Sequence, residues 1–293
     1  MVSQLAHLRQ KIKSIQTTKK ITHAVRLISM SFYNKLEKNY QPLNLYSTHL
    51  RTLFGHLLLY AKDWANETFL PHDLLDQRPL FVIVSTSKGL CGSLNSNLFK
   101  YFEQSLFLEP HQQASFIAIG SKAITYIKGR KLTSIVSVYQ EVNSSNLFAL
   151  TEELIAKILF SDARYTSVSF FSNEARSFFS QRPIKKTVLP LSVTMLKNDF
   201  DNTFDPDTEP ELIWEQEREM VLDRLAMRYL HSTIMQILFD AMRAEQAARF
   251  LAMDNSTNNA EKYLEPLIMQ FNKMRQALIT KEISECVSGR PGR

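Results

Sequence analysis

The sequence predicts an α/β protein whose two ends form a long antiparallel coiled coil, in which the N- and C-terminal helices pair with each other. Three observations support this prediction. The C-terminal stretch Glu211–Val287 contains no glycine and only one proline. Its apolar residues, and those of the N-terminal stretch, recur at alternating gaps of three and four residues. Between the two stretches, short apolar runs alternate with helical patterns, which is typical of an open α/β sheet.

The C-terminal repeat requires a partner helix along one seam. Its first part consists of Met227, Leu230, Ile234, Ile237, Ala241, Ala244, Ala248 and Leu251. A polar break follows at residues 254–259. The repeat then resumes in a new phase at Ala260, Leu264, Leu267, Phe271, Met274 and Leu278. Pro266 lies in this second part, where we expect a kink or local unwinding because proline removes a backbone hydrogen bond.

The N-terminal stretch, residues 3–60, predicts a second long helix. Its seam consists of Leu5, Leu8, Ile12 and Ile15, followed after a slip of one residue by Ile21, Val25, Ile28, Phe32 and Leu36. Pro42 predicts an interruption, after which the pattern from Leu43 to Trp64 is helical again. The simplest partner for each terminal helix is the other one, and they run antiparallel if the middle domain hangs from one end of the pair.

The middle of the chain predicts a small, open, Rossmann-like α/β domain. Its expected strands are Leu80–Val84, Ser115–Ile119, Ser134–Tyr139, Ser167–Phe171 and Lys186–Leu191. Ser145 is the expected cap of a helix over residues 147–160. An acidic, turn-rich connector at residues 199–211 leads into the C-terminal helix. The predicted domains are therefore 1–75, 76–198 and 199–293.

The positive charge of the chain is concentrated near its N-terminus. Residues 1–40 carry a net charge of +7, eight Lys or Arg against Glu37, whereas the whole chain carries +6. A basic helix fits nucleic acid, an anionic membrane surface or an acidic protein collar. No apolar run is long enough to span a bilayer, and we expect no signal peptide. Two cysteines far apart in sequence indicate a reducing compartment.

The chain offers little for catalysis. Lys88, Gly89 and Gly92 follow the first predicted strand, but their order fits neither a P-loop nor a dinucleotide-binding motif. A tight strand-to-helix turn is the better interpretation, with Cys91 as a small buried residue. The seven histidines form no metal-binding or catalytic pattern. We therefore predict no catalytic residue, no metal ligand and no cofactor site.

Three separated stretches resemble the γ subunit of F-type ATP synthases, in the order found in that family. Leu8–Ala24 resembles the opening signature, and Ser87–Asn95 is similar to the central-loop motif. The closing signature is matched by Glu245–Met253 and by Asn272–Ile283. The chain departs from the family at Val25–Ile28, at Ser29–Tyr33 and at Pro266, and is therefore identified as a divergent member, expected to be bacterial.

The resemblance implies a non-catalytic rotor shaft in a rotary ATP synthase. The paired helices would pass through a hexamer of α and β subunits, and the α/β domain would lie at the foot, against the ε subunit and the ring of c subunits. Ion flow would turn the ring and this chain, which would drive each catalytic β subunit through its conformational cycle. The complex would lie at the cytoplasmic face of the bacterial inner membrane, with this chain peripheral and without a membrane span.

The resemblance also implies a set of partner contacts. The matching positions are Arg275, Gln276, Ile279, Ile283, Lys19, Lys20, Arg26, Lys88 and Asn95. Arg275 and Gln276 match positions that contact a loop of β, and Ile279 and Ile283 belong to a tip seated in an apolar bearing. The three cations Lys19, Lys20 and Arg26 lie in the basic N-terminal segment. Lys88 and Asn95 bound the foot-domain loop. The alternative function is a basic helical adaptor or a nucleic-acid-binding protein.

Overall fold

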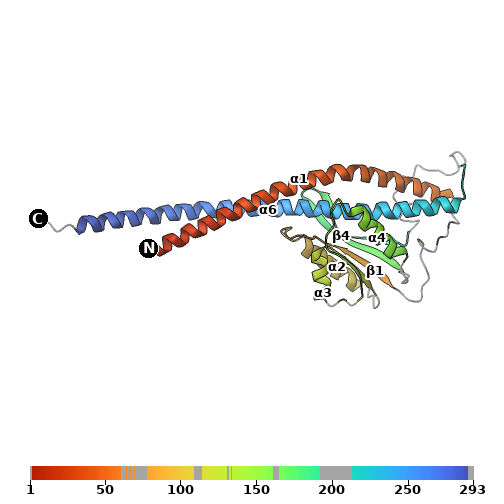
Figure 1. Ribbon diagram of the computed structural model, residues 1–293, viewed down its shortest axis with the longest axis horizontal. Coiled ribbons are helices and arrows are strands. Elements are labelled where there is room, and N and C mark those ends of the chain that lie inside the picture. Colours follow the sequence, from red (N-terminus) through yellow and green to blue (C-terminus); the bar gives the residue numbers. More distant parts are fainter. Residues whose placement is uncertain are drawn as a thin grey trace. The chain divides into compact units, whose positions relative to one another are not determined.

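The structure is a computed structural model (Figure 1). It describes residues 2–60, 64, 66, 69, 78–108, 114–130, 132, 134–160, 165–191 and 213–289. The chain divides into two compact units. The terminal unit comprises Met1–Ser31 and Arg249–Arg293, and the central unit comprises Phe32–Ala248. The domain boundaries expected from the sequence stay a prediction, and the expected acidic connector lies outside the described residues.

Two long helices account for the ends of the chain. Helix α1 extends from Val2 to Tyr60 and helix α6 from Arg218 to Ser288. The predicted interruption at Pro42 is wrong, because α1 continues through it. Pro42 is exposed, and apolar side chains on both sides of it, among them Leu36 and Phe54, are packed in the core. Their burial outweighs the loss of one backbone hydrogen bond, about 3 kcal/mol or more for a proline in a helix interior.

Helix α6 likewise continues without a break through the polar stretch at residues 254–259 and through Pro266. The local unwinding expected at Pro266 is therefore not observed. Pro266 is exposed, while Leu264, two residues before it, is buried and Leu267, directly after it, is half-buried. The apolar side of the helix is thus preserved on either side of the proline.

The central unit contains a five-stranded sheet of order β3-β2-β1-β4-β5. Its strands are β1 (Pro79–Val84), β2 (Ser115–Ile119), β3 (Ile135–Tyr139), β4 (Ser167–Ser177) and β5 (Ser180–Leu189). Strand β1 pairs in parallel with β2 and β4, and β2 pairs in parallel with β3. The first strand is buried along its whole length, as a continuous apolar run predicts for a central parallel strand.

The last two strands differ from the prediction. Strands β4 and β5 are longer than expected and form an antiparallel hairpin. The turn between them contains Phe178 and Phe179. These residues carry none of the Asn-Gly or Asp-Gly signals of a hairpin turn, so the sequence did not indicate a hairpin here. The residue before the helix at 147 also differs, because Asn146 rather than Ser145 is the N-cap.

Helices cover both faces of the sheet (Figure 1). Helices α2 (Leu94–Leu108) and α3 (Ser121–Gly129) pack on one face, around Phe81, Ile83 and Phe171. Helix α4 (Leu147–Leu159) and α6 pack on the other face, around Val82, Val84 and Phe170. The prediction of an α/β sheet domain together with two long terminal helices is confirmed.

Within the central unit, α6 is buried against both α1 and the sheet domain. Leu222, Ala226, Leu230 and Ile234 of α6 are fully buried, and Leu238, Phe239 and Met242 continue the same cluster. Phe54 of α1 is also fully buried. Its ring centroid lies 5.9 Å from that of Trp64 and 5.7 Å from that of Tyr229 on α6. A single seam, as predicted for α6, therefore describes only part of its buried surface.

Replacement of Phe54 by Ala should destabilise the chain by about 3–5 kcal/mol, because it leaves a cavity between α1 and α6. Phe179→Ala is the matched control, since this ring is 77% exposed and its loss should change stability by less than about 0.5 kcal/mol. Urea unfolding of the full chain measures both. Equal stability of the two variants would contradict the buried position of Phe54.

Candidate partner-contacting surfaces

Three side-chain pairs tie α1 to α6 within the terminal unit. Lys19 forms an ion pair with Glu261. The hydroxyl groups of Thr22 and Thr257 are 2.8 Å apart, and the Arg26 guanidinium lies 2.5 Å from the Asp254 carboxylate. As the residue number increases along α1, the residue number of its partner on α6 decreases, so the two helices are antiparallel. The polar break at residues 254–259 therefore supplies two of the three partners on α6, Asp254 and Thr257, and Glu261 follows it.

The buried side of α1 in this unit is shifted by one residue from the seam that the sequence predicted. Ile21 and Ile28 were assigned to the seam, but they are 57% and 55% exposed. Thr22 and Ser29 are buried in their place. Their hydroxyl groups are satisfied locally, because Thr22 donates to the Lys19 carbonyl and Ser29 donates to the Val25 carbonyl. Small polar side chains that bond to their own helix can occupy a tight helix contact without leaving an unpaired group.

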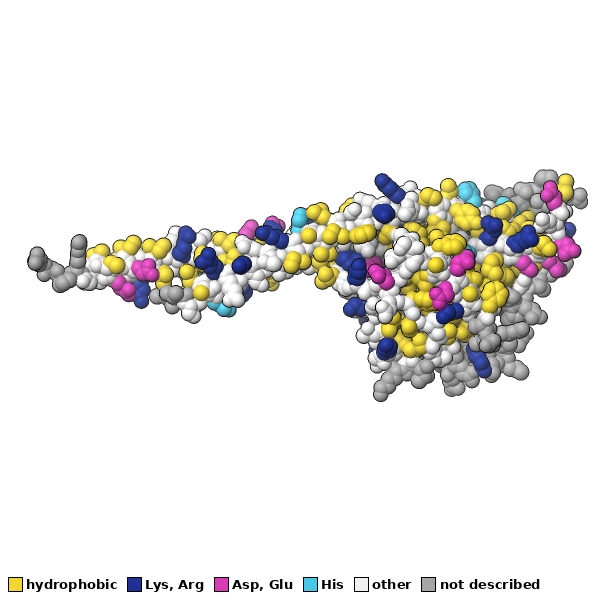
Figure 2. Space-filling view, in the orientation of Figure 1, with side chains coloured by type: hydrophobic (Ala, Val, Ile, Leu, Met, Phe, Trp, Pro, Cys, Tyr) yellow, Lys and Arg dark blue, Asp and Glu magenta, His cyan; other side chains and the backbone are white. Residues whose placement is uncertain are grey.

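The two displaced residues belong to a set of exposed apolar residues on α1, called the exposed apolar row below. Ile21, Leu27, Ile28 and Met30 are each between 36% and 57% exposed. Figure 2 shows hydrophobic side chains among Lys and Arg side chains along the helical segments that extend to the chain ends. Apolar side chains that face outward on a long helix, beside cations, are typical of a surface that a partner covers.

The three cations expected to contact partners in the basic segment have different environments. Lys20 is exposed, whereas Lys19 and Arg26 are engaged with Glu261 and Asp254. The Lys19 ammonium group lowers the pKa of the Glu261 carboxyl, through a hydrogen bond and through charge attraction. Part of the positive charge of this segment is thus matched within the helix pair.

The C-terminal part of α6 is the most exposed helical stretch of the terminal unit. Every described residue from Ile279 to Gly289 is exposed, and so are Arg275 and Gln276. Ile279 is 46% and Ile283 is 58% exposed. All four predicted contact residues of this stretch are therefore available to a partner. Their contacts stay a prediction.

In the central unit, the predicted tight turn after β1 is confirmed. Leu90 and Gly92 have φ of 66° and 57°, in the left-handed region that glycine adopts most readily. The Asn95 side chain holds the turn, because its carbonyl accepts from the Thr86 amide at 3.2 Å and its amide donates to the Thr86 hydroxyl at 2.8 Å. Cys91 is buried, as expected. Asn95, predicted as a partner contact, thus has a structural role in this turn.

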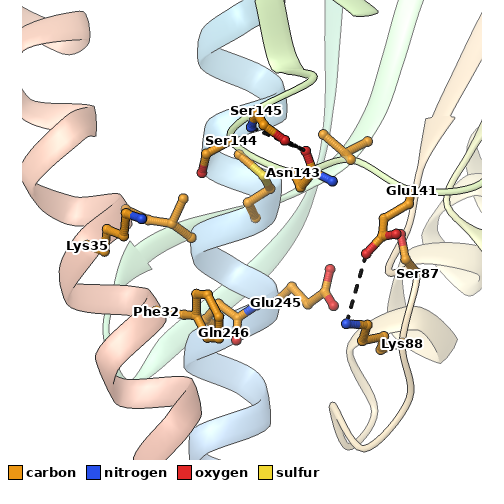
Figure 3. A pocket seen from close by; sticks show the side chains of 13 residues that line it. Phe32, Lys35, Ser87, Lys88, Glu141, Asn143, Ser144, Ser145, Glu245 and Gln246 are labelled. Atoms are coloured by element: carbon orange, nitrogen blue, oxygen red, sulfur yellow. Dashed lines mark hydrogen bonds and ion pairs between the residues drawn. The ribbon is translucent and has the colours of Figure 1, made fainter.

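Lys88 lies at a cavity of about 390 Å³ between α1, α6 and the loops that follow β1 and β3. Figure 3 shows Lys88 facing Glu141 at 3.9 Å, while Glu245 extends from α6 toward the same space. Asn143 shapes the β3–α4 loop by accepting hydrogen bonds from the amides of Ser145 and Asn146. The wall contains both cations and carboxylates.

A second set of polar contacts, not predicted from the sequence, ties α1 to α6 in the central unit. The Arg243 guanidinium donates to Glu37 at 2.9 Å and to Asp240 at 2.8 Å, and it lies 3.9 Å from the centroid of the Tyr40 ring. Arg243 is almost completely buried. A possible signal in the sequence was Glu37, the one acid in a strongly basic segment, together with an arginine inside the alanine-rich part of α6.

Burial dominates the electrostatics of this network. Removal from water raises the pKa of the Asp240 carboxyl to about 6, although Arg243 and the Tyr40 hydroxyl group favour its charged form. The Tyr40 pKa is raised as well, first by burial and then by the nearby Asp240 charge. Arg243 keeps its charge, because Glu37 and Asp240 together outweigh its own loss of hydration. The network therefore fixes a buried cation between two carboxyl groups.

Metal binding and membrane crossing have no candidate in the described part of the chain. Among the described residues, no three His, Cys, Asp or Glu side chains lie close enough together to hold a metal ion. No described helix combines the length and the hydropathy that a bilayer span requires.

Paired terminal helices attached to a five-stranded α/β domain are the fold of ATP synthase central-stalk subunits. A rotor chain of Euglena gracilis mitochondrial ATP synthase in rotational state 1 is 15% identical, with TM-score 0.62, 95% of this chain covered and 100% of that chain. A chain of the OSCP/F1/c-ring structure of the same enzyme in rotational state 3 is 16% identical, with TM-score 0.64 and coverages of 98% and 94%.

A chain of the central stalk and c-ring of Tetrahymena thermophila mitochondrial ATP synthase is 19% identical, with TM-score 0.59. The match covers 80% of this chain and 98% of that one. At these identities the likeness concerns the fold. The family is established by sequence, since a family model described as ATP synthase matches residues 4–291. The chain belongs to this family, that of the ATP synthase γ subunits.

The raised pKa of Asp240 predicts a specific pH dependence of stability. The protonated carboxyl contributes stability that is present below about pH 4 and is lost as the pH rises through about 6, because the folded state holds this proton more tightly. Relative to Asp240→Asn, the natural chain should lose on the order of 2 kcal/mol between pH 4 and 6.5. Glu265→Gln, at an exposed position of α6, is the control. A constant difference between Asp240→Asn and the natural chain would contradict the assignment.

Proposed function

We propose that the chain is the central rotor shaft of a membrane-bound rotary F-type ATP synthase. In this role it couples ring rotation, driven by ion flow, to conformational cycling of the catalytic β subunits. The observation that carries the proposal is the family match over residues 4–291. The antiparallel ties between α1 and α6, and the exposed apolar row beside them, agree with a shaft that turns inside a protein collar.

Each exposed surface is assigned a partner in this proposal. The row Ile21, Leu27, Ile28 and Met30 and the C-terminal part of α6 face the collar of α and β subunits. Arg275 and Gln276 make polar contacts with a loop of β, while Ile279 and Ile283 are seated in an apolar bearing at the end of the collar. The α/β domain, with Lys88 on its loop, contacts the ε subunit and the ring of c subunits at the foot.

The physical mechanism is a shift of populations among conformations of the β subunits. Different sides of the helix pair carry different side chains, so each orientation favours a different β conformation, and rotation selects these conformations in turn. A shaft transmits torque only if its two helices keep their register. The pairs Lys19–Glu261, Thr22–Thr257 and Arg26–Asp254 provide this in the terminal unit, since partly buried polar pairs disfavour a slipped alignment.

The proposal also assigns the chemical role of the chain and its location. The chain itself performs no catalysis and holds no cofactor, and ATP is made or hydrolysed on the β subunits. The complex lies at the cytoplasmic face of a bacterial inner membrane, and this chain is peripheral to the bilayer. The nucleic-acid alternative is not favoured, because Lys19 and Arg26 of the basic segment are directed to carboxylates of the same chain.

Co-expression with α and β subunits should give a complex that co-purifies through a tag on this chain and hydrolyses ATP. The complex forms because the exposed apolar row of α1 and the tip of α6 are buried by the collar. Size-exclusion chromatography and an ATPase assay measure this outcome. A complex of α and β that forms without this chain, together with salt-dependent binding of the isolated chain to DNA or RNA, would overturn the proposal.

Within such a complex, the double change Arg275→Ala and Gln276→Ala should lower ATP hydrolysis several-fold. The expected loss is about 1–3 kcal/mol of interaction with β, the range of a central interface residue. Lys273→Ala is the matched control, an exposed cation of the same helix segment. Both variants should keep the unfolding midpoint of the free chain, because the altered side chains are exposed. Equal rates of ATP hydrolysis in the two variants would contradict a contact of Arg275 and Gln276 with β.

A further inference from the structure

A mainly apolar cavity of about 340 Å³ lies between α2 and α3, on the face of the sheet opposite to α4 and α6. Its lining residues are Phe102, Glu103 and Leu106 of α2, Tyr126 of α3, and Arg130 and Leu132, which follow α3. Phe102 is fully buried, and Leu106 and Leu132 are half-buried. The apolar side chains thus form the inner wall of the cavity.

The Glu103 carboxylate gives this apolar cavity a hydrogen-bond acceptor. Its Oε1 atom accepts a hydrogen bond from the Tyr126 hydroxyl group at 2.9 Å and also binds the Arg130 guanidinium. Its Oε2 atom forms no hydrogen bond with the residues that the structure describes. Because an ionised carboxylate can accept about four hydrogen bonds, Glu103 can accept a further one. The Glu103 side chain is 33% exposed and that of Arg130 is 60% exposed, so the charged groups lie at the outer rim.

A second cluster of the same chemistry provides a comparison. On the opposite face of the sheet, the Tyr139 hydroxyl group donates to Glu153 at 2.9 Å, and the Lys157 ammonium group lies 3.4 Å from the same carboxylate oxygen. Neither Glu153 nor Tyr139 lines the cavity between α2 and α3. A tyrosine, a glutamate and a cation can therefore join two elements in this chain without forming part of this cavity.

From these observations we infer that the cavity binds a compact, neutral aromatic molecule that carries a hydrogen-bond donor, of the indole or phenol type. The donor of the ligand binds Glu103, and its ring packs against the apolar inner wall. Aromatic rings already dominate this region. The Tyr126 ring stacks on that of Phe99 at 4.2 Å between centroids and meets that of Phe102 edge-on at 6.2 Å. A further ring can pack against such a cluster in stacked or edge-on geometry.

Charge and volume narrow the class of ligand. The wall carries one cation and one anion, Arg130 and Glu103, which already match each other. A charged ligand would therefore lose its hydration without gaining an unmatched counter-charge. An apolar cavity of about 150 Å³ holds benzene, and pockets for drug-sized ligands measure about 300–1,000 Å³. A cavity of about 340 Å³ suits a molecule of one or two fused rings.

The ligand would act on the stability of the α/β domain. The site exists only where α2 and α3 are packed together, so the ligand binds the folded chain and not the unfolded one. It stabilises the central unit by mass action, increasingly as its concentration exceeds Kd. The inference does not depend on the rotor role, because it concerns the free chain as well.

The test is calorimetric titration of the purified full chain with indole and with 1-methylindole, which has the same rings but no N–H donor. Saturable binding of indole is expected, together with a rise in the unfolding midpoint. 1-Methylindole should bind about tenfold more weakly, the scale of one hydrogen bond to a charged acceptor.

Two variants test the position of the site. Glu103→Gln keeps the size of the side chain but removes its charge, so it should abolish most of the preference for indole over 1-methylindole. Leu106→Trp should abolish the binding of both molecules, because the larger side chain fills the cavity. The unfolding midpoint of each variant shows that it remains folded, and Glu103→Gln keeps the test valid if Leu106→Trp does not fold.

The matched control is Glu153→Gln, which makes the same change in the second cluster. It should bind indole and 1-methylindole as the natural chain does. The absence of saturable indole binding by the folded natural chain would overturn the inference. So would equal affinities for indole and 1-methylindole, or equal effects of Glu103→Gln and Glu153→Gln. Undiminished indole binding by a folded Leu106→Trp variant would place the ligand elsewhere and would overturn it as well.

Discussion

The burial of α6 between α1 and the sheet is the interaction on which the central unit depends. Residues such as Leu230 and Ile234 belong to one apolar cluster that also contains Phe54 of α1, Val82 of β1 and Leu154 of α4. Burial of each such side chain contributes about 1.5–3 kcal/mol. The same helix therefore closes the helix pair and covers one face of the sheet. Within the central unit, the helix pair and the sheet therefore share one hydrophobic core.

The terminal unit is held together differently. Its contact surface is poor in large buried side chains and instead contains Thr22, Ser29 and Thr257, with ion pairs beside them. Exposed ion pairs contribute little stability because water screens them, but several polar pairs in one register disfavour a slipped alignment. Large apolar residues such as Ile28 face outward in consequence. The contacts inside this unit therefore define the register of the helix pair, and the exposed apolar side chains are left for the partners of the proposed complex.

Much of this fold could be predicted from the sequence, because the spacing of the apolar residues and the composition of each stretch determine it. The buried run at Leu80–Val84 and the heptads of the C-terminal helix give strong signals, and both were confirmed. The predicted buried side of α1 was wrong at Ile21 and Ile28, because the prediction counted only apolar residues. Thr22 and Ser29 can be buried instead, since their hydroxyl groups donate hydrogen bonds to carbonyl groups of their own helix.

The hairpin at Phe178 was missed because its turn has no glycine or asparagine. The Arg243 network was missed because a buried ion pair depends on two helices far apart in sequence. Among the predicted contact residues, the structure gives Asn95 a role in a turn. It leaves Arg275, Gln276, Ile279 and Ile283 exposed, as a contact surface requires.

The most direct test of the central claim is observation of rotation in single complexes. Cys91 is buried and Cys286 is exposed, so Cys286→Ser with Lys128→Cys places one reactive thiol on α3 of the α/β domain. A bead or gold particle on this thiol, with the α and β subunits fixed to a surface, reports the motion of the shaft. Stepwise rotation in one direction is expected when ATP is added. ATP hydrolysis by complexes whose particles stay still would contradict it.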